Sequence, residues 1–151
     1  MHKELKSRLI ELCENQLKNK LNELQSLIEG SGAKENSENK SSAGDKHNTS
    51  QAMLHLEQEK NAKIYADVKR QYHFFKSIQF KSKYQKVEIG SLVKTNHLTL
   101  FIAVNLGKIC VENQEIYCIS SASPLGQNLV GKQINDTVKA NSNPIKIIDL
   151  C

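Results

Sequence analysis

Cysteine and histidine are the residues in this 151-residue chain most able to bind a metal or act as nucleophiles. The cysteines are Cys13, Cys110, Cys118 and Cys151, and no two of them form a C-x-x-C pair. The histidines are scattered without ligand spacing, at His2, His47, His55, His73 and His97. Since a structural zinc site needs four ligands, only the fold could assemble one here. We therefore expect reduced thiols and surface histidines.

Carboxylates and a Ser-Pro pair are the other candidates for a functional role. Asp45 precedes a second predicted helix, where a carboxylate caps the helix or interacts with its dipole. Glu35 and Glu38 lie in the same polar segment, and loop charges of this kind are usually solvated. Ser123-Pro124 indicates the start of a short helix, because Ser favours the N-cap and Pro the first helical position.

The net charge of +5 is concentrated in the middle of the chain. Residues 49–86 contain 8 Lys or Arg against 3 Asp or Glu, whereas the segments on either side are balanced. The basic stretch consists of Lys60, Lys63, Lys69, Arg70, Lys76, Lys81, Lys83 and Lys86. It could attract RNA or an acidic protein surface, or it could be a solvated helix face.

Two long helices are predicted for the first half of the chain. Residues 3–29 have an apolar seam of helical spacing, interrupted by a slip of one residue. The seam residues are Leu5, Leu9 and Leu12, then Leu17, Leu21, Leu24 and Ile28. Residues 30–48 are polar and predict a loop, after which a helix capped by Thr49 or Ser50 extends to Phe80.

The second predicted helix has a seam of its own. It begins with Met53 and Leu56 and continues through Ile64 or Tyr65, Val68, Tyr72, Phe75 and Ile78. Residues 1–82 should therefore form an antiparallel α-helical hairpin, a short coiled coil of roughly 40 Å.

Residues 83–151 have β character. Predicted strands lie at 87–93, 98–104, 116–119 and 145–148, with turns at 105–107 and 112–114. A short helix begins at Ser123, and Gly131 suits the position after its end. The fold class is therefore α+β, with a helical hairpin followed by a small antiparallel sheet and one short helix.

No stretch has the ~20 apolar residues of a membrane helix, and the N-terminus lacks the features of a signal peptide. We therefore expect a cytoplasmic protein without membrane association.

Two segments resemble the Gre family of bacterial transcription elongation factors. One is Ile119-Ser120-Ser121-Ala122-Ser123-Pro124-Leu125-Gly126, followed by Leu129, Gly131-Lys132 and Asp136-Thr137-Val138. The other is Gly44-Asp45-Lys46-His47-Asn48-Thr49 at the predicted hairpin tip. Together these segments give a resemblance along the whole chain, which is strongest at residues 87–138.

The resemblance implies an accessory factor of RNA polymerase that is not itself an enzyme. In the family, the hairpin enters the secondary channel and an FKBP-like domain binds its rim. Tip acids help the polymerase hold a Mg²⁺ and cleave backtracked RNA, so Asp45 would act at that shared metal and the chain would need no cofactor of its own. The basic stretch Lys60–Lys86 would then be a candidate contact for the 3′ end of the transcript. The docking residues would be Ser120, Ala122, Ser123, Pro124 and Leu125.

The sequence also departs from the family pattern. Asn48 stands where a second tip acid, a Glu, is expected, and an amide has no charge and cannot act as a base. Ala122 stands where the family often has Asp, and Asn135 where it usually has Gly.

Several functions remain open at this stage. The chain could stimulate transcript cleavage, or it could be a non-catalytic regulator or inhibitor that fills the same channel. A generic helical interaction protein is a further alternative. A prolyl isomerase is disfavoured because a β-rich part with few aromatic residues offers a poor apolar pocket.

Overall fold

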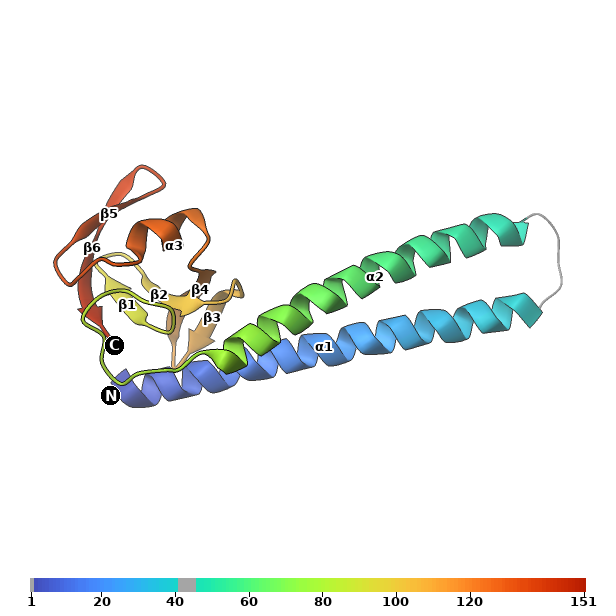
Figure 1. The fold of residues 1–151 in the computed structure, drawn as a ribbon, viewed down its shortest axis with the longest axis horizontal. Coiled ribbons are helices and arrows are strands. Elements are labelled where there is room, and N and C mark those ends of the chain that lie inside the picture. The colour runs from blue at the N-terminus through green and yellow to red at the C-terminus, as the bar shows by residue number, and fades with distance from the viewer. Residues whose placement is uncertain (1, 41–45) are drawn as a thin grey trace. The chain divides into compact units, whose positions relative to one another are not determined.

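The computed structural model describes the backbone of residues 2–40 and 46–151, and the side chains of residues 2–30 and 51–151. The chain divides into two compact units (Figure 1). The sheet unit consists of Met1–Glu14 and Phe74–Cys151, and the hairpin unit consists of Asn15–His73. Helices α1 (His2–Lys40) and α2 (Lys46–Ser77) each contribute residues to both units.

The predicted polar loop at residues 30–48 is shorter than expected. Helix α1 continues to Lys40, and α2 begins at Lys46, ahead of the predicted caps Thr49 and Ser50. A glycine costs a helix only about 1 kcal/mol, and α1 continues through both Gly30 and Gly32.

The hairpin unit has a thin core between its two antiparallel helices. Leu17, Leu24 and Val68 are buried. Met53 and Leu56, predicted to lie in the seam, are exposed by 67% and 66% instead. The half-buried residues of this part of α2 are instead Leu54, Gln58 and Asn61, so a different stripe of the helix is covered.

The apolar stripe at the start of α1 differs from the prediction at one position. Leu12 is 41% exposed, whereas Cys13 is completely buried. The stripe therefore runs from Leu9 to Cys13 to Leu17 in steps of four, without the predicted slip. Because each step of four advances about 40° beyond a full turn, such a stripe winds slowly around the helix.

The sheet has six strands in the order β3-β4-β2-β1-β6-β5 (Figure 1). Their bounds are β1 Leu92–Thr95, β2 Thr99–Ala103, β3 Gly107–Val111, β4 Gln114–Ser120, β5 Thr137–Ala140 and β6 Asn143–Leu150. The predicted α+β class is confirmed, but the sheet is mixed because β2 and β4 pair in parallel. The long connection through β3 lets β4 return beside β2 in the same direction.

Two strands were not predicted, and one predicted strand is shorter than expected. β5 has only four residues, and in β3 the exposed Cys110 between buried Ile109 and Val111 obscures the alternation in the sequence. Residues 87–91 precede β1 rather than forming part of it. The predicted turn after β3 is present, with Glu112 and Asn113 both at positive φ, as in tight hairpins.

Both faces of the central strands are covered inside the sheet unit. Helix α3 (Pro124–Leu129) lies over one face, where its Leu129 packs with Leu100 and Ile102 of β2 (Figure 1). Phe101 belongs to the opposite face and stacks on Phe80 with ring centroids 6.0 Å apart. Coverage on both sides explains why four of the five residues of β2 are buried, a pattern typical of strands without a solvent face.

No helix in the described part of the chain is long and apolar enough to span a membrane.

Candidate functional site

The connection between β4 and α3 forms a closely hydrogen-bonded turn. Strand β4 ends at Ser120, and the Ser123 hydroxyl donates a hydrogen bond to the Ser120 carbonyl oxygen at 2.6 Å. The Ser123 oxygen also accepts from the Gly126 amide at 3.1 Å, which is the predicted N-cap interaction. The Ala122 amide donates to the Ser120 hydroxyl at 3.1 Å. Both serine side chains therefore hold the turn together.

Gly126 is the tightest position in this turn. A Cβ atom placed on Gly126 would lie 2.1 Å from the Ser120 carbonyl oxygen and 2.9 Å from the Ser123 hydroxyl oxygen. Because the nearest atom belongs to the backbone, no side-chain rotation relieves the contact. Glycine at 126 is thus a steric requirement of the Ser120–Gly126 turn, which we call the Ser-Pro turn.

The Ser-Pro turn presents a small, rigid surface. Ala122 and Pro124 are exposed, while Leu125 is half-buried against the core under α3. Gly131, with φ of +88°, follows the Val130 C-cap as predicted. The five predicted docking residues therefore lie together, and Ala122 and Pro124 are the most exposed of them. Their role in docking stays a prediction.

The structure describes little of the residues predicted to lie at the hairpin tip. Asp45 lies outside the described residues. Asn48 falls in the first turns of α2, and its side chain lies outside the described part, as do the side chains of Glu35 and Glu38 on α1. The proposed role of Asp45 at a shared Mg²⁺ therefore rests on its position in the sequence.

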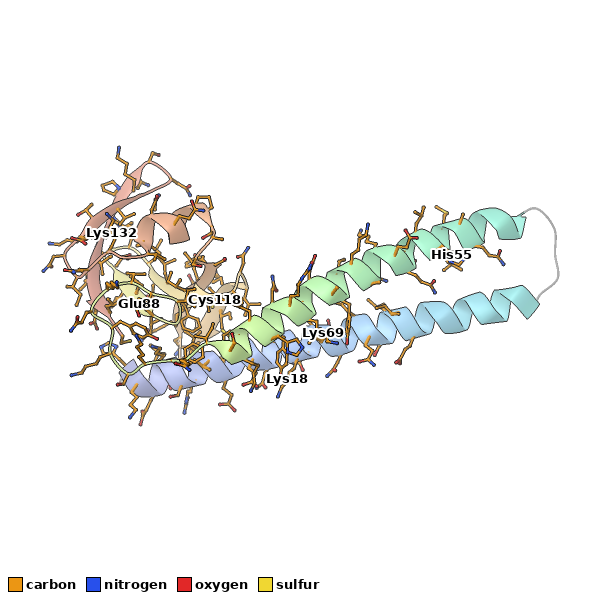
Figure 2. All side chains as sticks on the ribbon, viewed as in Figure 1. Lys18, His55, Lys69, Glu88, Cys118 and Lys132 are labelled. Carbon is orange, nitrogen blue, oxygen red and sulfur yellow. The ribbon has the colours of Figure 1, made fainter. Side chains whose placement is uncertain are left out.

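The basic stretch lies partly on α2 and partly in the segment after it. Lys69 is exposed on α2 (Figure 2). Ion pairs join Lys76 to Glu14 at 2.8 Å and Lys81 to Glu88 at 3.2 Å. Glu14 and Glu88 lie outside residues 49–86 and offset two of the positive charges there, which still leaves the basic stretch with an excess of positive charge.

A buried lysine in the sheet unit was not predicted. Lys6 is 6% exposed, its ammonium group donates to the Lys81 carbonyl oxygen at 3.0 Å, and it lies 4.4 Å from the centre of the Tyr84 ring. Burial lowers the pKa of Lys6 from 10.5 to about 8, and the nearby Cys151 opposes this shift. These residues line a cavity of about 610 Å³. Nothing in the sequence indicates that Lys6 is buried, because a lysine beside Leu5 in an amphipathic helix is normally expected to be exposed.

Two cysteines far apart in the sequence meet inside the sheet unit. The sulfur atoms of Cys13 on α1 and Cys118 on β4 are 3.7 Å apart, and both side chains are completely buried. Figure 2 labels Cys118. Within the described residues, no three or more His, Cys, Asp or Glu side chains gather as a metal site would need.

No protein-family model matches the chain, and no curated protein matches it. Among solved structures, the chain is similar to the structure of the transcription factor Gfh1, with 13% sequence identity. That match covers 91% of this chain and 92% of the other, with a TM-score of 0.35. A likeness at this level carries no argument about function, so the proposal below depends on the residues of this chain.

Proposed function

We propose that this chain is a transcription elongation factor that binds RNA polymerase, with its helical hairpin entering the polymerase's secondary channel. The observation that carries the proposal is the Ser-Pro turn. Its hydroxyl groups and Gly126 lock one another in place, and the residues matching the Gre-family motif converge there. A rigid, exposed turn loses little conformational entropy on binding, which suits it for docking on a partner.

The hairpin unit supports the second part of the proposal. Its segments of α1 and α2 are 26 and 28 residues long up to the helix ends at Lys40 and Lys46, so each extends roughly 40 Å. Two helices packed through a thin core form a narrow element, of the kind needed to enter a channel. The basic stretch would interact with the transcript or with an acidic wall of that channel.

The proposed chemistry belongs to the polymerase rather than to this chain. Mg²⁺ prefers oxygen ligands and retains several waters, so one added carboxylate can complete its coordination. Asp45 would supply that carboxylate from the tip, and the chain would act as an accessory factor rather than as an enzyme.

Asn48 favours a second candidate function, a non-catalytic regulator of the same channel. An amide at this position cannot add a second negative charge to that of Asp45, and it cannot accept a proton from water. A chain with a single tip acid could occupy the channel without activating cleavage.

A cleavage assay on backtracked polymerase complexes tests both candidates. If the elongation-factor proposal holds, the chain releases short 3′ RNA fragments, Asp45→Ala abolishes the release and Asn48→Glu increases it. Binding without release, by the chain and by Asn48→Glu alike, would favour the regulator. Absence of binding would contradict both.

A matched pair of substitutions tests the docking turn. Ala122→Asp restores the acid that the family often has, and we expect tighter binding to the polymerase. Asn128→Asp adds the same charge nearby, at an exposed position of helix α3, and should leave affinity unchanged. Equal effects of the two substitutions would mean that charge alone, rather than the Ser-Pro turn, governs the interaction.

A further inference from the structure

Cys13 and Cys118 form an isolated pair of thiols in the interior of the sheet unit. Their sulfur atoms are 3.7 Å apart, although the residues are separated by 105 positions in the chain. Both side chains have no exposed surface. The contact joins helix α1 to strand β4, two residues before the Ser-Pro turn begins at Ser120.

We propose that Cys13 and Cys118 are an oxidation site at which a small peroxide forms an intramolecular disulfide that ties α1 to β4. This inference does not depend on the proposed function. A disulfide requires a sulfur–sulfur distance of about 2.05 Å, so the two atoms must approach by about 1.7 Å. We expect rotation of both side chains, with movement of α1 toward the sheet, to supply that approach.

The reaction balances with one peroxide molecule. Both S–H bonds break and one S–S bond forms, so the two sulfurs give up two electrons. Those electrons break the O–O bond of hydrogen peroxide, whose oxygens take up the two thiol protons and leave as two water molecules.

The surroundings of the pair restrict which oxidants can reach it. A hydrogen bond with Cys13 and burial raise the pKa of Cys118, so this thiol stays protonated at neutral pH. Because thiolates react faster than thiols, this protonation slows the oxidation of Cys118. Burial also excludes bulky reagents, so we expect slow oxidation of the pair, and only by small oxidants that enter the interior. Cys110, by contrast, is exposed and Cys151 is half-buried. Peroxide would oxidise each of them without forming an intramolecular disulfide, because neither is described in contact with another thiol.

Oxidation of a full-length Cys110→Ser/Cys151→Ser variant isolates the pair. After treatment with hydrogen peroxide under native conditions, we expect mass spectrometry to find tryptic peptides 9–18 and 109–132 joined within one molecule. Once the protein is denatured, a maleimide should no longer label either cysteine. Because the disulfide closes a loop of over 100 residues, the melting temperature should rise by about 10 °C, and dithiothreitol should reverse the rise.

Two further variants serve as controls. Cys13→Ala and Cys118→Ala in the same background should show neither the linked peptides nor the rise in melting temperature. If one of them fails to fold, the other and the peptide linkage still decide the question. Full maleimide labelling of both cysteines after peroxide treatment, or linkage only between molecules, would overturn the proposal and leave the pair as packing thiols.

Discussion

The close approach of Gly126 to Ser120 makes Gly126→Ala a sharp test of the Ser-Pro turn. An added methyl group would lie 2.1 Å from the Ser120 carbonyl oxygen, far inside the separation of unbonded atoms. The turn must open to admit it, which breaks the Ser123 hydrogen bonds to the Ser120 carbonyl and the Gly126 amide. At about 1 kcal/mol per hydrogen bond, plus strain, the loss is about 2–4 kcal/mol.

The size of this effect is measurable by thermal unfolding. For a chain of this length, about 3 kcal/mol corresponds to a fall in melting temperature of roughly 6–12 °C. Gly131→Ala is the matched control, since its Cβ would meet no atom within 4 Å and only its φ of +88° opposes alanine. That control should cost about 1 kcal/mol. If Gly126→Ala destabilised the protein no more than Gly131→Ala does, the account of a locked turn would be wrong.

Further predictions concern the helices and the buried lysine. Leu9→Ala should lower the free energy of unfolding, measured in urea, by about 2–5 kcal/mol, because Leu9 is completely buried. Leu12→Ala should lower it by under about 1 kcal/mol, because Leu12 is 41% exposed. Gly30→Ala should stabilise α1 by about 1 kcal/mol, since its Cβ would meet no atom within 4 Å. Helicity measured by circular dichroism should then increase, and a loss of helicity would contradict a helix that continues through residue 30. The pKa of Lys6 is about 8 when folded against 10.5 normally, so between these values the unfolded chain binds the extra proton. Stability should therefore rise with pH across this window by at most about 3 kcal/mol, and urea unfolding of Lys6→Met should not show that rise.

The sequence predicted the elements that depend on local signals. The two helices, the α+β class and the start of α3 at Ser123-Pro124 followed from apolar spacing and capping chemistry, and the structure confirms them. The predicted helix end near residue 30 was wrong because the polar composition of residues 30–48, with Gly30 and Gly32, was taken to end the helix, although each glycine costs a helix only about 1 kcal/mol.

The remaining differences arise from tertiary contacts. Cys13 was considered for its chemistry rather than as a small apolar residue, so the stripe was placed on Leu12 instead. The parallel pairing of β2 with β4 depends on how the chain returns after β3, which no local pattern specifies. The approach of Gly126 to Ser120, like the meeting of Cys13 and Cys118, appears only once the chain is folded.

Equilibrium binding to purified bacterial RNA polymerase tests the central claim most directly. We expect the chain to bind, Gly126→Ala to weaken the affinity at least about tenfold at a temperature where it remains folded, and Gly131→Ala to bind as the unmodified chain does. A chain that does not bind, or whose affinity is unaffected by Gly126→Ala, would contradict the claim that it docks on the polymerase through the Ser-Pro turn.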